Sequence, residues 1–146
     1  MIALDTNLLV YAHRPDTPEF GRASSAVASL LETSEERVGI PAPCIGEFLT
    51  VVTGRRLSSD PTPLTRALAQ VDAWLNAPVA QVIGERAGYW PLLRGLLERS
   101  GFTGARIHDA RIAAICLDHG VREFWTADRD YGWFPELRTR NPLVGG

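Results

Sequence analysis

Four acidic residues stand where carboxylates of separate segments are able to meet and do chemistry. They are Asp5, Glu47, Asp109 and Asp128. Carboxylates held about 5 Å apart repel one another by roughly 3 kcal/mol at an effective dielectric constant of about 20, so such a cluster stays ionised only beside a cation. Because the set contains no cysteine or histidine, its oxygen atoms favour Mg²⁺, or Mn²⁺, over Zn²⁺. A divalent ion held in this way activates water and neutralises charge on phosphate, which is the chemistry of phosphodiester hydrolysis.

The alternation of apolar segments predicts the elements that position these acids. Short apolar runs over residues 2–5, 38–40, 79–83 and 123–126 indicate buried strands. Helical spacing of apolar residues indicates helices over 8–12, 19–31, 44–53, 64–75, 89–99 and 107–119. Strands that alternate with helices predict an α/β fold, a three-layer α/β/α arrangement around a central, mostly parallel sheet. The length favours one domain over residues 1–146.

This arrangement predicts that the four acids converge. Asp5 ends the first strand, Asp128 follows the last, and Glu47 and Asp109 lie near the starts of their helices. In open α/β sheets the reactive crevice lies beyond the carboxyl ends of the strands, so all four can share one edge. Taken singly, each has a structural explanation as a turn former, a first-turn helix acid or a solvated helix residue. Glu47 is the most informative, because its neighbours on the helix are apolar.

The segments between the predicted elements give two local expectations. Residues 57–63 resemble a linker, and within them Thr62 is predicted to cap the following helix, with Pro63 at its first position. Residues 100–106 contain glycine and are predicted to form a loop.

Composition excludes several classes of function. The formal charge of −2 lacks the basic signature of a protein that grips nucleic acid mainly through phosphates. All fifteen basic residues are arginine, and the absence of lysine excludes Schiff-base and Walker A chemistry. Cys44 and Cys116 fit no metal-binding spacing and are predicted to be buried free thiols rather than a disulfide. No apolar run reaches the roughly 20 residues of a membrane span, and no signal segment is recognisable, so we expect a cytoplasmic protein.

Four motifs in sequence order resemble those of the PIN domains, and among them the VapC-type toxins of bacterial toxin–antitoxin pairs. The motifs are Asp5-Thr6-Asn7, Cys44-Ile45-Gly46-Glu47-Phe48-Leu49, Ile107-His108-Asp109-Ala110 and Thr126-Ala127-Asp128-Arg129-Asp130-Tyr131. The resemblance spans nearly the whole chain, and none of the four acidic positions departs from the family pattern. It implies a metal-dependent endoribonuclease whose metal-binding and catalytic residues are these four acids.

The same resemblance implies supporting residues and partners. Thr6, Asn7 and Thr126 would support the acids by hydrogen bonds, while Asp130 would take either an outer-sphere metal role or cap its loop. The family implies selectivity for single-stranded RNA and inhibition by a VapB-like antitoxin. It also implies a homodimer, with a toxin–antitoxin hetero-oligomer as the alternative assembly.

Residues beside the third and fourth motifs form a predicted RNA-facing surface. Arg106, Arg111 and Arg129 are candidates for binding phosphates, with ordinary solvated charges as the alternative. Trp133 and Phe134 are candidates for stacking on unpaired bases, with core packing as the alternative, which we favour for Phe134.

Two other readings remain open. A metal-free ribonuclease would use two of His13, His108 and His119 as general base and acid. A non-catalytic α/β metal-binding or regulatory module would bind metal without hydrolysis. The helices over 64–75 and 89–99 also carry more apolar surface than one core face requires, so part of it is a candidate partner surface, with core packing as the default.

Overall fold

The structure, a computed structural model, describes residues 1–55 and 60–145, and five parallel strands form its centre. The strands are β1 (Ile2–Leu4), β2 (Val38–Pro41), β3 (Ala80–Ile83), β4 (Glu123–Trp125) and β5 (Thr139–Arg140). Their order across the sheet is β3-β2-β1-β4-β5, and every pairing is parallel. Ile2 of the central strand pairs with Val38 on one side and Glu123 on the other. The carboxyl ends of β1 and β4 therefore meet at one edge of the sheet.

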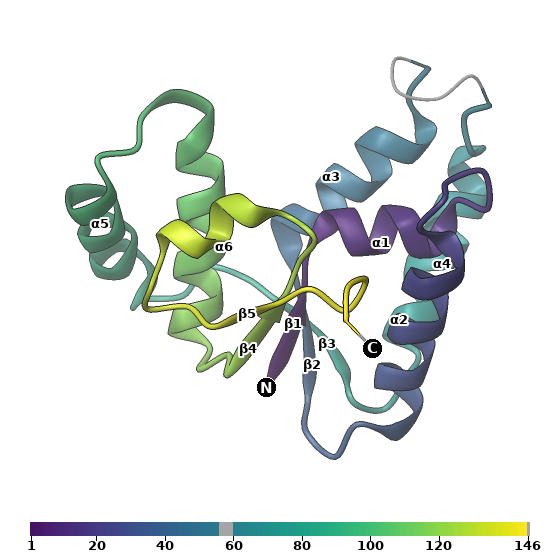
Figure 1. The fold of residues 1–146 in the computed structure, drawn as a ribbon, viewed down its shortest axis with the longest axis horizontal. Coiled ribbons are helices and arrows are strands. Elements are labelled where there is room, and N and C mark those ends of the chain that lie inside the picture. The colour runs from purple at the N-terminus through teal and green to yellow at the C-terminus, as the bar shows by residue number, and fades with distance from the viewer. Residues whose placement is uncertain (56–59, 146) are drawn as a thin grey trace.

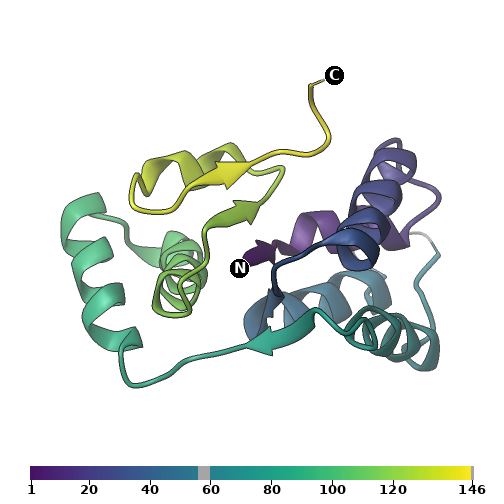
Figure 2. The ribbon, with the colours of Figure 1, turned by 90° about the horizontal axis from the view of Figure 1, so that it is seen from below.

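Helices cover both faces of this sheet. They are α1 (Thr6–His13), α2 (Phe20–Thr33), α3 (Ala42–Thr53), α4 (Leu64–Leu75), α5 (Tyr89–Ser100) and α6 (Ile107–Asp118), with 3₁₀ turns η1 (Gly104–Arg106) and η2 (Arg129–Trp133). Helices α5 and α6 lie on one side, and α1, α2 and α4 on the other (Figures 1 and 2). The predicted three-layer α/β/α fold is confirmed. Among the helices of the described residues, none has both the length and the apolar character to cross a bilayer.

Burial explains why the strands read as apolar runs. A parallel sheet covered on both faces leaves no solvated side, so its strands need continuous apolar residues rather than alternation. All three residues of β1 are buried, and the buried apolar residues of the described chain form one cluster. Phe48 packs edge-on against Trp74, with ring centroids 5.1 Å apart, and joins α3 to α4. Cys44 and Cys116 are buried free thiols, as predicted.

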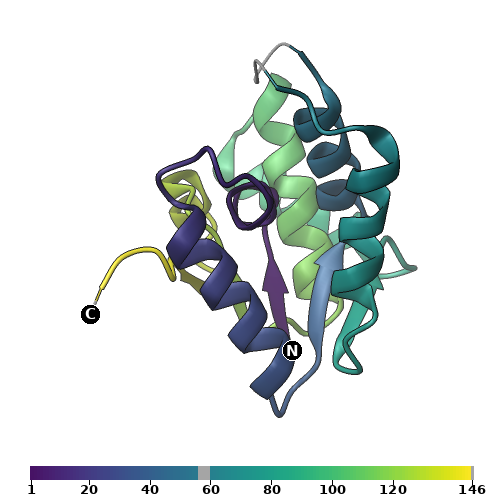
Figure 3. The same ribbon diagram turned by 90° about the vertical axis from the view of Figure 1, so that its right-hand side faces the viewer.

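The polar triplet after β1 forms the start of a helix instead of a turn. We predicted a strand through Asp5 and a helix from residue 8, whereas β1 ends at Leu4 and α1 begins at Thr6. The Asp5 carboxylate accepts a hydrogen bond from the Thr6 backbone N–H, so Asp5 is the N-cap. This cap places Thr6 and Asn7 in the first turn of α1. Figure 3 shows the purple helix α1 directly beyond the purple strand β1.

The predicted cap of α4 is wrong. Helix α4 begins at Leu64 with Pro63 as the N-cap residue, and no side chain caps it. The Thr62 hydroxyl lies 3.0 Å from Nε2 of His13 instead, so it serves tertiary packing between α1 and the segment before α4. Residues 57–59 of the predicted linker lie outside the described residues.

Three short elements were not predicted, namely the 3₁₀ turns η1 and η2 and the strand β5. Residues 104–106, expected within a loop, form the 3₁₀ turn η1. Strand β5 has two exposed residues, too few to show any hydrophobic period. Its backbone completes the sheet nonetheless, because the Arg138 and Arg140 carbonyls accept hydrogen bonds from Phe124 and Thr126.

Candidate active site

The four predicted acids line one cleft at the carboxyl edge of the sheet. Its volume is about 310 Å³. The lining residues come from the N-cap of α1, from α1, α3 and α6, and from the segment after β4: Asp5, Thr6, Asn7, Val10, Tyr11, Glu47, Val51, Asp109, Ile112, Asp128 and Tyr131. Segments far apart in sequence therefore supply carboxylates to one solvent-accessible hollow, as the order of the strands requires.

Asp5 is the most buried of these acids, with 5% of its surface exposed. One carboxylate oxygen accepts the Thr6 N–H at 2.8 Å, and the other accepts the Thr126 hydroxyl at 2.6 Å. Burial raises the pKa of Asp5 from 3.8 to about 6, and the negative charges of Glu47 and Asp128 add to the rise, while both hydrogen bonds oppose it. An acid held partly against its own ionisation at neutral pH is a group that a bound cation would stabilise.

The Thr126 hydroxyl joins the first and last motifs. It donates to Asp5 and accepts hydrogen bonds from the Asp128 backbone N–H at 2.9 Å and the Asn7 side-chain amide at 3.4 Å. The Asn7 side-chain oxygen in turn accepts the Ala127 N–H at 3.2 Å. These bonds fix α1 to the segment after β4 and hold Asp5 and Asp128 in register.

Replacing Thr126 with valine is expected to destabilise the protein by about 1–3 kcal/mol, because the change keeps the shape and leaves buried partners unsatisfied. Urea unfolding would measure the loss. Thr50→Val is the matched control, because the exposed Thr50 hydroxyl bonds only the Gly46 carbonyl one turn back. Equal losses in the two variants would contradict the joining role of Thr126.

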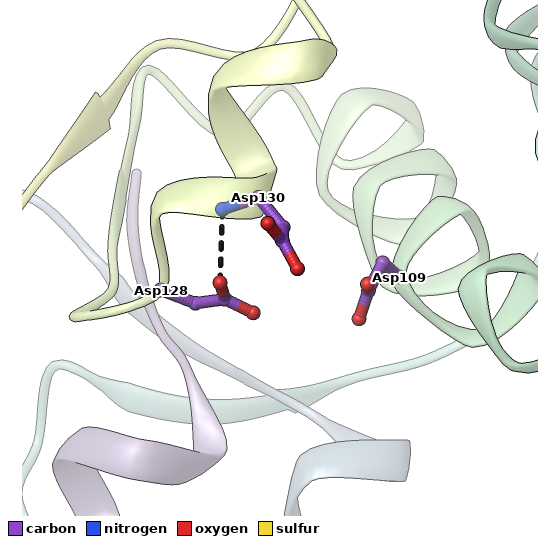
Figure 4. Close-up of side chains that lie close together, drawn as sticks. All are labelled: Asp109, Asp128 and Asp130. Atoms are coloured by element: carbon purple, nitrogen blue, oxygen red, sulfur yellow. Dashed lines mark hydrogen bonds between the residues drawn. The ribbon is translucent and has the colours of Figure 1, made fainter.

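Three carboxylates lie close enough to hold one ion. Asp109, on α6, and Asp128 and Asp130, at the start of η2, each offer an oxygen within 4.8 Å of the other two (Figure 4). The Asp130 N–H donates to Asp128 at 2.9 Å, which orients that carboxylate toward the cluster. Burial raises the pKa of Asp109, and the charge of Asp128 adds to it. Hard oxygen donors, partly buried and mutually repelling, fit Mg²⁺ or Mn²⁺.

Glu47 lines the same cleft from α3. The Thr6 hydroxyl donates to Glu47 Oε2 at 2.7 Å, and His108 Nε2 lies 3.1 Å from Glu47 Oε1. Its side chain is 43% exposed, although it follows apolar neighbours on α3, because it is on the face of the helix turned to the cleft. The hydrogen bond from Thr6, which Asp5 caps, links Glu47 to the first motif.

Comparison with known proteins identifies the family of this chain. The PIN domain family matches residues 2–137. The ribonuclease VapC43 of Mycobacterium tuberculosis is 35% identical over 145 residues, which cover 99% of this chain and 97% of that protein. The chain belongs to the PIN-domain family, and within it to the VapC ribonucleases. The ribonuclease VapC48 of the same species is 28% identical over 97% of both proteins.

Solved structures show the same fold for this VapC-family chain. The complex VapBC2 from Rickettsia felis, bound to a promoter DNA fragment, matches with a TM-score of 0.67 and 20% identity, over 97% of this chain and 98% of that one. The sarcin–ricin loop-cleaving toxin VapC20 of Mycobacterium tuberculosis matches with a TM-score of 0.66 and 19% identity, over 90% and 93%.

The histidines of this PIN domain lie in separate networks. His13 places its two ring nitrogens near Gln70 and Thr62, and His119 Nε2 lies 2.7 Å from the Gly84 carbonyl oxygen. Of the three, only His108 contacts an acid of the cleft. These contacts bring no two of the three histidines together, whereas a metal-free mechanism needs two histidines at one phosphate.

The arginines named from the sequence differ in their surroundings. Arg111 pairs with Glu85 at 2.8 Å, and Arg129 is exposed. Arg106 lies 3.9 Å from Asp130 and is the one that approaches the carboxylate cluster of this PIN domain. Phe134 is 1% exposed, so core packing is confirmed for it.

Sequence reasoning missed the hydrophobic wall of the cleft. Tyr131 is buried and lines the cleft, and it closes the fourth motif that carries the PIN resemblance. Tyr11 lies four residues after Asn7 on α1, a spacing that places both on one helix face. Helical spacing from Asn7 was therefore a usable signal, whereas Val51 and Ile112 carry no chemical signature.

Proposed function

We propose that this VapC-family protein is a Mg²⁺-dependent endoribonuclease, with Mn²⁺ as the alternative ion, that hydrolyses phosphodiester bonds in single-stranded or structured loops of RNA. The cluster of Asp109, Asp128 and Asp130, of which Asp109 and Asp128 line the same cleft as Asp5, is the observation that supports it. Family membership supports the ribonuclease class, and the donor chemistry supports the hard divalent ion.

In this mechanism Asp109, Asp128 and Asp130 would hold the ion, and Asp5 would add a further negative charge beside it. When bound, the ion supplies neutralising charge for the phosphate and a water of lowered pKa. Glu47, whose carboxylate accepts a hydrogen bond from the Thr6 hydroxyl, would accept a proton as water attacks phosphorus. The P–O3′ bond breaks as the new P–O bond forms, and the 3′-oxyanion takes a proton from solvent. The products would carry 5′-phosphate and 3′-hydroxyl ends.

The proposed biological role is that of a toxin with a cognate VapB-like antitoxin. Complexes of VapBC2 and of FitAB are among the similar structures, and both are described as bound to a DNA fragment. A homodimer, alone or within a toxin–antitoxin hetero-oligomer, is part of this proposal, and RNA substrates would place its action in the cytoplasm.

The predicted apolar surfaces are divided between the core and the outside. Trp74, Leu93 and Leu96 are buried, whereas Leu64 and Trp90 are exposed. A second hollow of about 530 Å³ lies between α2 and α4 and is lined partly by alanines. The hollow between α2 and α4 is the part of these surfaces that suits the partners proposed above.

Incubation of the purified protein with total bacterial RNA, in Mg²⁺ or in EDTA, tests the proposal. We expect discrete cuts in Mg²⁺ only, with 5′-phosphate ends by end mapping. Cuts that persist in EDTA and leave 2′,3′-cyclic phosphates would instead support the histidine mechanism. Metal binding without cleavage of any RNA would support a non-catalytic module.

A further inference from the structure

Trp133 is an exposed aromatic side chain beside the carboxylate cluster. It leaves 59% of its surface to solvent, although the next residue, Phe134, is 1% exposed. Tyr131 and Phe134 anchor η2 in the core, where Tyr131 packs edge-on against Phe124 with centroids 4.8 Å apart. Tyr131 and Phe134 therefore attach η2 to the core. Their packing does not explain why Trp133, the last residue of the turn, is a large ring that faces solvent.

The geometry of η2 places Trp133 next to the acids. In a 3₁₀ helix the side chains three residues apart eclipse, so Asp130 and Trp133 point to the same side. The Arg106 guanidinium meets both, 3.9 Å from Asp130 Oδ2 and 4.7 Å from the centroid of the Trp133 ring. Asp130 belongs to the carboxylate cluster with Asp109, so Arg106 connects Trp133 to that cluster.

The Trp133 ring is also fixed in orientation. Phe102, which is buried, lies 5.2 Å from it between ring centroids, and the Arg106 guanidinium lies 4.8 Å from the Phe102 ring. Two segments thus meet at this ring, one from before α6 and one from after β4. A ring held in place loses little freedom when a ligand stacks on it.

We propose that Trp133, oriented by Arg106, is a stacking platform for an unpaired base of the RNA next to the phosphate that is cut. The inference rests on the proposed ribonuclease function. The half-exposed Arg106 guanidinium supplies positive charge where the overall charge is negative, which suits a polyanion entering an acidic cleft. Every base has a π-face, whereas a base inside a duplex is already stacked, so this platform would select single-stranded RNA with little preference of base.

Binding of two short fluorescent probes tests the platform. One is a single-stranded oligouridine, and the other is an abasic ribose-phosphate chain of equal length. Binding is measured in Mg²⁺ in an Asp5→Asn background, in which cleavage is expected to be lost. Contacts to phosphate act on both probes alike, so the ratio of their dissociation constants reports the bases alone. We expect this ratio to be roughly 5- to 100-fold in favour of oligouridine.

The variants separate stacking from structure. Trp133→Leu keeps an apolar contact for Phe102 but has no π-face, so we expect its ratio to fall toward one, while Trp133→Phe keeps most of the preference. Trp90→Leu is the matched control, because Trp90 is an equally exposed tryptophan on α5, whereas the Trp133 ring contacts Arg106 beside the carboxylate cluster. An unchanged ratio in Trp133→Leu, a loss equal in the Leu and Phe variants, or no preference for bases in the Asp5→Asn background would overturn the inference. Absence of cleavage by the wild-type chain, with the ratio intact, would instead reject the proposed function alone.

Discussion

Asp5→Asn is expected to lower the rate of RNA cleavage by on the order of 100- to 1,000-fold, the range typical of losing one preorganised charged or polar group at the reacting centre. Asparagine keeps the shape of the side chain and can still accept the Thr6 N–H, so α1 retains its cap. What it removes is the negative charge that faces Asp128 and Glu47 in the cleft. Single-turnover cleavage of a fragment identified from total RNA would give the rate.

The matched control for this loss is Asp72→Asn. Asp72 is exposed on α4 and does not line the cleft, so the same chemical change there is expected to leave the rate within about twofold, since surface substitutions have small effects. Equal rates for the Asp5 variant and the wild type would remove Asp5 from the mechanism, whatever the metal requirement proves to be.

The cleft could be predicted because two of its acids, Asp5 and Asp128, follow the ends of neighbouring strands. The alternation of strands and helices along the chain places residues 5 and 128 beyond the ends of neighbouring parallel strands. This placement does not depend on the details of side-chain packing. The same reasoning does not rank the acids by distance. Asp130 comes into the tight cluster because η2 winds as a 3₁₀ turn capped by Asp128, and a five-residue turn has no hydrophobic period to announce it.

Thr62 shows a second kind of limit. A threonine before Pro63 and an apolar helix satisfies every local rule for a cap, but its hydroxyl is near His13, 49 residues earlier in the chain. Tertiary contacts override local preference where a buried polar group needs a partner. The arginines show the same limit, because Arg106 and Arg111 look alike in sequence, and only packing decides which one approaches the cluster.

The acidic cleft is expected to be a source of instability in the protein without metal. The pKa of Asp5 is about 6 in the folded protein against 3.8 as the reference value, so the folded state binds this proton more tightly than the unfolded state. Stability from Asp5 is therefore full below about pH 4 and is lost as the pH rises through 6. The loss amounts to about 3 kcal/mol, since one pKa unit corresponds to about 1.4 kcal/mol.

The difference in unfolding free energy between Asp5→Asn and the wild type isolates this group, because asparagine does not titrate. In EDTA, urea unfolding between about pH 4 and pH 8 should show this difference moving by about 3 kcal/mol in favour of the variant. Changes in hydrogen bonding to Thr126 add an offset that does not depend on pH. The slope of the free-energy difference against pH is therefore the quantity that reports the ionisation of Asp5. Mg²⁺ at 100 times its dissociation constant should return about 2.7 kcal/mol to the wild type.

Glu36→Gln gives a control of opposite sign. Hydrogen bonds from Arg122 and from the N-terminal amine lower the pKa of Glu36 from 4.5 to about 2, so its contribution is present above about pH 4.5 and is lost as the pH falls through 2. The Gln variant should therefore lose stability relative to the wild type at neutral pH, where the Asp5 variant gains it. A difference for Asp5→Asn that stayed constant with pH would mean that Asp5 is not held against its ionisation. Opposite slopes, for Asp5→Asn between about pH 4 and pH 8 and for Glu36→Gln between about pH 2 and pH 4.5, would show that the stability lost at neutral pH arises in the cleft. Binding a cation there would offset this local loss of stability.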